Sequence, residues 1–237
     1  MPTELSAKDK VVLVTGAGRG IGAAIARRLA ADRARVIAAA RTTKQLDALM
    51  AELKPLRGDC LAVPTDLASE ASIDNLVRVV NDEVGRLDAL VNNAGVAWAK
   101  PIGEVTLEDW RALMAVNVDA VFLLTSKLLP VFHAQHNGQI VNICSDAGIR
   151  GIGGMTCYCA SKFALRGFTL ALREELRGSG IRTNLVLPGP VNTTIIAKEA
   201  DRMDLPQPED IADVVWQVIA LPSRADVWEV LVEPGPV

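Results

Sequence analysis

Short apolar runs rich in β-branched residues alternate along the chain with longer segments in which apolar residues recur every three or four positions. The short runs predict strands at Val11–Val14, Arg35–Ala39, Cys60–Val63, Ala89–Val91, Gln139–Ile143, Arg182–Leu187 and Glu229–Val232. The longer segments predict helices at Ile21–Ala31, Lys44–Leu53, Glu70–Val84, Leu107–Phe132, Tyr158–Arg177 and Pro208–Ala220.

This alternation predicts an α/β fold. Runs such as Val11–Val14 are apolar without alternation, which is typical of parallel strands covered by helices on both faces. Right-handed crossovers then give a single doubly wound Rossmann-type domain over residues 1–237, with a mostly parallel seven-stranded sheet. Ligands of such sheets bind beyond the C-terminal ends of the strands, so the residues that follow each strand are the candidates for function.

Charge and hydropathy narrow the classes of partner. The net charge is −3 and no basic block is present, which argues against a nucleic-acid or anionic-membrane partner. No uninterrupted apolar run reaches the roughly 18 residues that span a bilayer. The first residues, MPTELSAKDK, are polar and mixed in charge, unlike a signal peptide. We therefore expect a cytoplasmic protein that acts on a small molecule, with no nucleic acid and no membrane.

Cysteine and histidine positions do not suggest a metal or a disulfide framework. The four cysteines lie at positions 60, 144, 157 and 159, without the spacing of either kind of site. Cys157 and Cys159 flank Tyr158, and packing is the expected role rather than a redox pair. The only histidines, His133 and His136, are expected at a helix end, where the helix dipole favours an imidazolium.

A glycine-rich loop follows the first predicted strand and precedes the first predicted helix. Its candidate cofactor-binding residues are Gly16, Gly18, Arg19, Gly20, Ile21 and Gly22. Glycines allow a tight turn and let a pyrophosphate approach the amides at the positive end of the helix. The spacing departs from G-x-G-x-x-G because Ile21 occupies the third glycine's place. The loop predicts a dinucleotide site.

The end of the second strand indicates which dinucleotide binds. An NAD site usually has an acid there for the ribose 2′-hydroxyl. Here the strand ends in Arg41, and Arg19 projects from the glycine loop toward the same region. Two guanidinium groups bind a 2′-phosphate through charge-assisted bonds, so the pattern predicts NADP(H) rather than NAD(H).

Tyr158 and Lys162 form the candidate catalytic pair. Tyr158 is the only tyrosine of the chain, and the four-residue spacing puts both side chains on one helix face. Carbonyl reduction needs a proton donor, and an ammonium near a phenol lowers the pKa of that phenol. Ser145 follows the fifth strand and offers a hydroxyl that can hold the developing alkoxide.

These motifs resemble the short-chain dehydrogenase/reductase family. The resemblance rests on T-G-x-x-x-G-x-G after strand one, Asp66 after strand three, Asn92-Asn93-Ala94-Gly95 after strand four, Asn117, Ser145, Tyr158 with Lys162, and Pro188-Gly189 after strand six. It implies an NADP(H)-dependent oxidoreductase of the carbonyl reductase type, active as a homodimer or homotetramer. The apolar stripes of helices five and six are the expected interface.

The resemblance also implies roles for individual residues. Asn117 is expected to order a water beside Lys162 and so complete a proton relay with Ser145 and Tyr158. The residues expected to contact the cofactor, besides the glycine loop and Arg41, are Asp66, Leu67, Asn93, Ala94, Gly95, Tyr158, Lys162, Pro188, Gly189, Val191 and Thr193.

Three features leave alternatives open. A short substrate lid is expected near 192–207, and Arg150 and Lys198 are the candidates for binding an acidic substrate group, but the substrate itself stays open. Relatives often end their first helix with glycine, where this chain has Arg33, so that helix is expected to end differently. The alternatives to a reductase are an NAD(P)-binding sensor or scaffold protein of the same fold and an enzyme of NAD-dependent alcohol oxidation.

Overall fold

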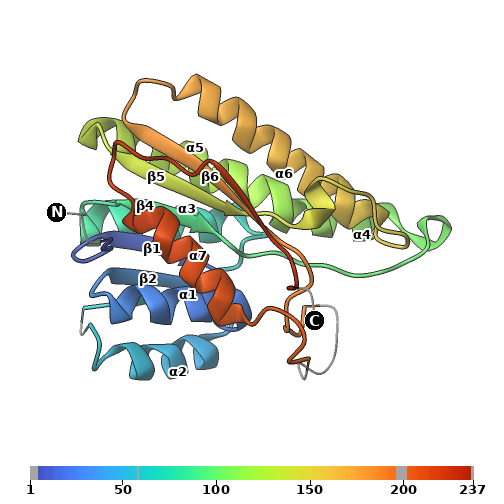
Figure 1. The fold of residues 1–237 in the computed structure, drawn as a ribbon, viewed down its shortest axis with the longest axis horizontal. Coiled ribbons are helices and arrows are strands. Elements are labelled where there is room, and N and C mark those ends of the chain that lie inside the picture. The colour runs from blue at the N-terminus through green and yellow to red at the C-terminus, as the bar shows by residue number, and fades with distance from the viewer. Residues whose placement is uncertain (1–4, 58, 196–201, 236–237) are drawn as a thin grey trace.

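A parallel sheet of seven strands forms the centre of the computed structural model, which describes residues 5–57, 59–195 and 202–235 (Figure 1). The strands are β1 (Val11–Thr15), β2 (Arg35–Ala40), β3 (Leu61–Pro64), β4 (Ala89–Asn92), β5 (Gly138–Ile143), β6 (Ile181–Pro188) and β7 (Glu229–Val232). Their order is β3-β2-β1-β4-β5-β6-β7, and every neighbouring pair is parallel. The winding reverses between β1 and β4, which is the switch point where such sheets bind ligands.

Helices cover both faces of this sheet (Figure 1). They are α1 (Gly20–Ala31), α2 (Thr43–Leu53), α3 (Glu70–Arg78), α4 (Leu107–Met114), α5 (Ala120–Gln135), α6 (Thr156–Glu175) and α7 (Pro208–Ala220). Alternate side chains of β1 serve the two layers: Val12 and Val14 pack with α1, α2 and α7, while Val11 and Leu13 pack with α3, α5 and α6. Both faces of the strand are therefore buried, which explains its unbroken apolar sequence.

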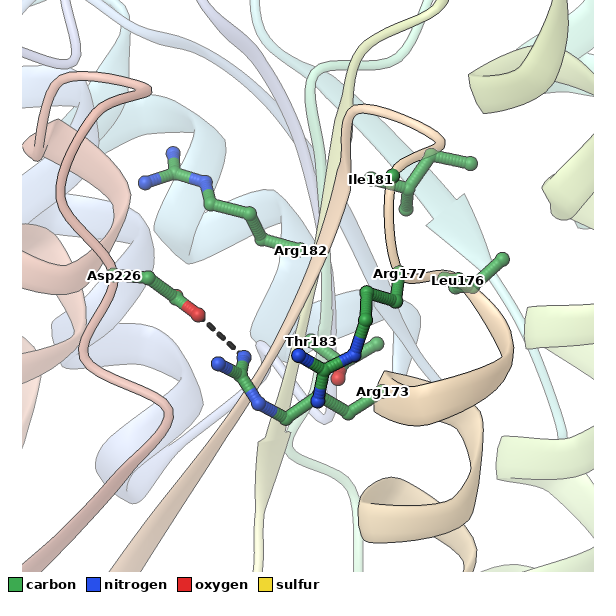
Figure 2. A pocket seen from close by; sticks show the side chains of 8 residues that line it. Arg173, Leu176, Arg177, Ile181, Arg182, Thr183 and Asp226 are labelled. Atoms are coloured by element: carbon green, nitrogen blue, oxygen red, sulfur yellow. Dashed lines mark hydrogen bonds and ion pairs between the residues drawn. The ribbon is translucent and has the colours of Figure 1, made fainter.

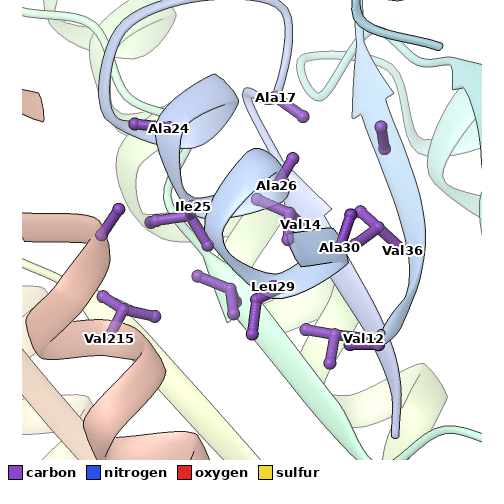
Figure 3. Close-up of a cluster of buried hydrophobic side chains, with 14 of the residues drawn as sticks. Val12, Val14, Ala17, Ala24, Ile25, Ala26, Leu29, Ala30, Val36 and Val215 are labelled. Atoms are coloured by element: carbon purple, nitrogen blue, oxygen red, sulfur yellow. The ribbon is translucent and has the colours of Figure 1, made fainter. Parts of the chain in front are cut away.

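The layer around α1 shows how close packing sets the position of that helix (Figure 3). Ala26 and Ala30 are fully buried, and their small side chains let α1 lie directly against β1 and β2. Ile25 and Leu29 are also fully buried and join the same cluster as Val215 of α7. A buried leucine of this kind contributes about 1.5–3 kcal/mol. The N-terminal end of α1 is thereby held at the edge of the sheet where ligands bind.

Two of the predicted helices contain π-helical turns. The predicted helix Glu70–Val84 consists of α3 and a π-helical segment, Val79–Val84. The predicted helix Leu107–Phe132 extends to Gln135, and its α4 and α5 parts are separated by the π-helical segment Ala115–Asp119. Apolar periodicity marks the extent of a helix but not one widened turn, so the sequence pattern did not locate these two segments. Such turns are frequent at functional sites.

The helical stretch Leu107–Gln135 corrects the expectation that no segment is long and apolar enough to span a bilayer. By length and composition alone it is apolar enough to cross a membrane, although no uninterrupted run suggested this. In the fold, Leu124, Leu128 and Phe132 of this stretch are buried against the sheet. A core helix of a soluble domain passes the same test of length and composition, and we interpret it as one.

The end of α1 lacks the expected glycine and is built differently. Arg33 adopts the left-handed conformation, with φ of +60°, just beyond the C-cap Asp32. The carboxylate of Asp32 accepts a hydrogen bond from Trp216 Nε1 at 2.8 Å, and the Arg28 guanidinium lies 3.8 Å from the centre of a Trp216 ring. These contacts join α1 to α7.

Candidate functional site

One cavity of about 920 Å³ collects the predicted site residues at the C-terminal ends of the strands. Every residue predicted to contact the cofactor lines this cavity, from Gly16 in the glycine loop to Thr193 after β6. Ser145, Tyr158 and Lys162 line it as well, whereas Asn117 does not. Residues far apart in the sequence thus meet at one site, as the order of the strands requires.

The glycine loop is packed too tightly for larger side chains. Gly16 has φ of +66°, and a Cβ placed there would lie 2.9 Å from Ala94 Cα. A Cβ on Gly22 would lie 2.3 Å from the carbonyl oxygen of Gly16. The first turn of α1 is therefore drawn against the loop, and its N-terminal end, where unpaired amides favour an anion, lies at the cavity.

The asparagine-rich turn after β4 supports this loop. Thr15 Oγ1 accepts hydrogen bonds from the amides of Asn93 at 3.0 Å and Ala94 at 3.1 Å. In return, Asn93 Nδ2 donates to the carbonyl of Thr15 at 2.9 Å. Thr15 was not predicted as a site residue. Its position as the last residue of β1 was the available signal.

One basic side chain, that of Arg41, lies at the end of β2. Arg41 lines the cavity and is exposed, and the described acidic residues in the lining are Asp66 and Asp146, neither of which belongs to β2. Asp66 Oδ1 accepts from the amide of Ala68 at 3.1 Å. Arg19 was expected to project toward the same region, but it donates to Thr194 Oγ1 at 3.0 Å, in the segment that follows β6. The positive charge at this end of the cavity fits a phosphate group.

Tyr158 and Lys162 project from the first turns of α6. The Lys162 Nζ lies 5.7 Å from the centre of the Tyr158 ring. Lys162 is only 4% exposed, and its ammonium donates to the carbonyl of Ile143 at 3.0 Å. Because a buried charge needs such a partner, this bond holds the ammonium at the end of β5, beside the tyrosine.

Asn117 lies behind the cavity wall, in the π-helical segment Ala115–Asp119. Its Oδ1 accepts from the amide of Val96, and its Nδ2 donates to the Val96 carbonyl, both at 2.9 Å. The same Nδ2 donates to Ser161 Oγ at 3.0 Å. A Cβ on Gly95 would lie 3.5 Å from Asn117 Oδ1 and 3.8 Å from Lys162 Nζ. Asn117 therefore fixes the loop after β4 next to Lys162, and its role in a relay stays a prediction.

Ser145 is buried, and its hydroxyl proton is already used in a hydrogen bond. The Oγ donates to Asp146 Oδ1 at 2.8 Å and accepts from the amide of Ala147 at 3.1 Å. Asp146 Oδ2 accepts from Arg150 Nε at 2.9 Å. Sequence reasoning gave Asp146 no role and treated Arg150 only as a possible substrate ligand. Opposite charges four residues apart, directly after the candidate serine, were the signal for this pair.

The cysteines have the environment of packing residues. Cys144, Cys157 and Cys159 are buried, and Cys60 is half-buried. Burial raises the pKa of the Cys144 and Cys60 thiols, which keeps them protonated and weakly nucleophilic at neutral pH. The Cys144 thiol points at the carbonyl of Lys162, 3.3 Å away.

The two histidines lie at a helix end, as expected. His133 is in the last turn of α5, and His136 is its C-cap residue with φ of +49°. Within the described residues, no group of three or more histidine, cysteine or acidic side chains is arranged to hold a metal.

The part of the cavity nearest Tyr158 has an apolar wall. Val96, Ile152 and Met155 line it, with Trp98 and Trp110 packed in the same cluster as the tyrosine. The predicted lid 192–207 is described only at its two ends, where the Asn192 amide donates to the Pro206 carbonyl at 2.9 Å. Lys198 lies outside the described residues.

A second cavity, of about 170 Å³, lies at the opposite, N-terminal end of β6 (Figure 2). Arg173 of α6 pairs with Asp226 there. Arg182 of β6 donates to the carbonyl of Ala225 and to Gln139 Oε1, both at 2.9 Å. These bonds join α6 and β6 to the segment before β7, and we interpret the cavity as structural.

Comparison with known proteins extends over nearly the whole chain. A family profile described as short chain dehydrogenase matches residues 10–204. An uncharacterized oxidoreductase of Staphylococcus aureus is 32% identical over 228 residues, which are 95% of this chain and 97% of the relative. A 3-oxoacyl-[acyl-carrier-protein] reductase of Synechocystis is 35% identical over 225 residues, or 91% of each chain.

Solved structures show the same fold. A metagenomic short-chain oxidoreductase in complex with NADP is 37% identical, with a TM-score of 0.86, over 99% of this chain and 100% of the other. The closed form of a serine dehydrogenase complexed with NADP+ is 30% identical, with a TM-score of 0.87, over 94% of each chain. The similarity covers all the strands that line the cavity.

Proposed function

This chain belongs to the short-chain dehydrogenase family, and we propose that it is an NADP(H)-dependent oxidoreductase that interconverts a ketone or aldehyde and the corresponding alcohol. The observation that carries the proposal is the placement of Tyr158 and Lys162 in the same cavity as the glycine loop. When bound, NADPH supplies the hydride that reduces the carbonyl carbon. The remaining requirements, which are proton delivery and stabilisation of charge, fall to the side chains of this chain.

The lining of the cavity fits this dinucleotide. The glycine loop and the start of α1 would bind the pyrophosphate, because close backbone approach and unpaired amides suit an anion. Arg41 would bind the 2′-phosphate, and Arg19 would join it once its guanidinium leaves Thr194 Oγ1. Lys162 and the segment Pro188–Thr193 would hold the nicotinamide end. Relatives of 37% and 30% identity have been solved with NADP or NADP+, which supports this choice of cofactor.

The proposed chemistry assigns one task to each catalytic side chain. Tyr158 gives its phenolic proton to the carbonyl oxygen as negative charge develops there, and it takes the proton back in alcohol oxidation. Lys162 stabilises the phenolate that remains, since its ammonium lies beside the ring. Ser145 hydrogen-bonds the substrate oxygen. Asn117 holds the adjoining loop and supports proton supply through Lys162.

The lining of the cavity near Tyr158 indicates what kind of substrate binds there. The apolar wall of Val96, Ile152 and Met155 favours a carbonyl compound with an apolar substituent.

Phe122 of α5 and Phe163 of α6 are 54% and 48% exposed, which supports a homodimer or homotetramer assembled through these helices. Four free thiols, three of them buried, suit the reducing cytoplasm.

The test is oxidation of NADPH, followed by its absorbance, against a panel of ketones and aldehydes with NADH measured alongside. Turnover with NADPH, lost in Tyr158→Phe, is the expected result. Tight NADPH binding without any turnover would instead identify a sensor or scaffold. Faster reaction with NADH, or with NAD+ and alcohols, would contradict the cofactor assignment.

A further inference from the structure

The hydroxyl proton of Ser145 is directed at a carboxylate, not into the cavity. Ser145 Oγ donates to Asp146 Oδ1 at 2.8 Å, and its other contact, from the amide of Ala147, uses one of its lone pairs. A serine hydroxyl has a single proton to donate. The hydroxyl must therefore turn away from Asp146 before it can donate to a substrate oxygen.

The local backbone keeps these side chains in place. Ser145 caps a short 3₁₀ turn, Asp146–Gly148, and the amide of Arg150 donates to the Asp146 carbonyl at 3.0 Å. A Cβ on Gly148 would lie 2.6 Å from Cys144 Sγ and 3.1 Å from the Lys162 carbonyl. The turn is thus pressed against α6, and Asp146 stays within reach of Ser145.

Arg150 occupies the other oxygen of the same carboxylate. Its Nε donates to Asp146 Oδ2 at 2.9 Å, and Nη2 is in contact with the same oxygen. The Asp146 side chain is 6% exposed, and that of Arg150 is 57% exposed, although both line the cavity. A guanidinium on one carboxylate oxygen withdraws negative charge from the other, which weakens the bond that the other oxygen accepts.

We propose that Asp146 and Arg150 are positioning residues that set how readily Ser145 donates a hydrogen bond to the substrate oxygen. Asp146 competes with the substrate oxygen by accepting that hydrogen bond itself, and Arg150 makes Asp146 a weaker acceptor. The proposal rests on the proposed function, because it assigns this balance to the same reaction. A carboxylate accepts a hydrogen bond more strongly than a neutral carbonyl does. Asp146 therefore competes most effectively with the neutral carbonyl of the bound substrate, and the pair should affect mainly the binding of that substrate.

Removing the two partners should therefore change substrate binding in opposite directions. Asp146→Asn leaves a weaker neutral partner for Ser145, so KM for the carbonyl substrate should fall about fivefold while kcat stays within about twofold. Arg150→Gln leaves the carboxylate uncompensated, so KM should rise by about the same factor. In a Ser145→Ala background both effects should disappear, because the pair acts only through the serine. Damage to the fold alone would lower activity in both variants and would persist without the serine.

A second measurement needs no substrate. In Ser145→Cys, the pH at which iodoacetamide alkylates the introduced thiol, located by peptide mass spectrometry, reports the charge beside it. Adding Asp146→Asn should lower that midpoint by about one pH unit, and adding Arg150→Gln should raise it. The other titratable groups nearby are the same in every variant; they are Cys144, Tyr158, Lys162, Arg166, Glu229 and Glu233.

The outcomes separate this inference from the proposed function. KM shifts of the same sign, additivity with Ser145→Ala, or an unchanged alkylation midpoint would overturn the role of the pair. If no carbonyl compound is reduced by the wild type, the proposed function fails, and the alkylation midpoints still decide whether Asp146 and Arg150 control the group at position 145. Should Asp146→Asn fail to fold, Arg150→Gln, at an exposed side chain, decides by both measurements.

Discussion

Lys162 illustrates how one residue depends on a backbone group for its place. Its ammonium is almost completely buried and is held by the carbonyl of Ile143, the last residue of β5. A buried ammonium without such an acceptor costs several kcal/mol, or loses its charge. The bond therefore keeps a positive charge beside Tyr158, where the proposed proton transfer needs it.

The first prediction at this scale concerns Tyr158. Tyr158→Phe removes only the phenolic oxygen, so turnover should fall about 10³-fold because the carbonyl oxygen loses its proton donor. NADPH affinity, measured by fluorescence titration, should change less than about twofold. Near-wild-type rates would show that another group delivers the proton.

The second prediction concerns Arg41. Arg41→Asp places a like charge against the 2′-phosphate, so the Kd for NADPH should rise at least about tenfold while that for NADH stays nearly constant. Arg111→Asp, at an exposed arginine of α4 outside the cavity lining, is the matched control for net charge. Equal losses in the two variants would indicate general electrostatics.

Sequence reasoning identified the residues of the cavity better than their partners. The glycine loop and Ser145 follow strands directly, and Tyr158 and Lys162 stand one turn apart at the start of α6, so their convergence followed from the topology and the helix spacing. Ser161 could not be found in this way, because its bond to Asn117 joins two helices 44 residues apart in sequence. Asp146 was missed because its bond to Ser145 depends on the 3₁₀ turn Asp146–Gly148, which apolar periodicity does not reveal.

At the scale of elements, the π-helical turn Ala115–Asp119 couples three parts of the fold. It points Asn117 between the loop after β4 and the first turns of α6. A regular α-helix over the same residues would rotate the positions that follow the widened turn. The widened turn is therefore the local feature that brings this side chain to its site.

The third prediction tests this coupling. Asn117→Ala breaks three hydrogen bonds and leaves the amide and carbonyl of Val96 unpaired, so the free energy of unfolding should fall by about 2–4 kcal/mol. Ser161→Ala removes one of these bonds and also the bond from Ser161 Oγ to the Tyr158 carbonyl, so it should cost about 1–2 kcal/mol, less than Asn117→Ala. Urea denaturation measures both, and equal losses would mean that Asn117 does not hold the loop.

The fourth prediction concerns the end of α1. Arg33 has φ of +60°, a region that a side chain with a Cβ adopts only at a cost. Arg33→Gly should raise the free energy of unfolding by about 0.5–1 kcal/mol, while Arg33→Ala should bring no such gain. Thermal unfolding of the two variants compares them, and a gain in both would point to the lost charge instead.

Element positions were predictable because apolar patterns report burial directly. All seven strands lie within one residue of their predicted ends, since each is bounded by turn residues or helix starts. The helices differ by up to three residues at one end, as in α5, where apolar residues stop at Phe132 but the helix runs to Gln135. Helix ends depend on capping bonds, which periodicity does not contain.

At the scale of the whole molecule, the exposed aromatic side chains Phe122 and Phe163 lie on α5 and α6, the helices through which we propose that the chain assembles. Phe163→Asp on α6 should shift the particle mass, measured by light scattering, from a dimer or tetramer toward smaller species. Ile102→Asp is the control, because Ile102 is also an exposed apolar residue and lies outside α5 and α6. An unchanged mass in Phe163→Asp would exclude this face as the interface.

The chain contains a single tyrosine, and that tyrosine is the candidate acid at the end of the cavity. Every tyrosine-specific spectral change in this protein therefore originates from one known atom group. Ultraviolet difference spectra recorded against pH, with Tyr158→Phe as the blank, would follow the ionisation of that phenol alone, without isotope labels and without a substrate. The same spectra recorded with NADP+ added, or in the Lys162→Ala variant, would show how the cofactor and the Lys162 ammonium each change the ionisation of the Tyr158 phenol.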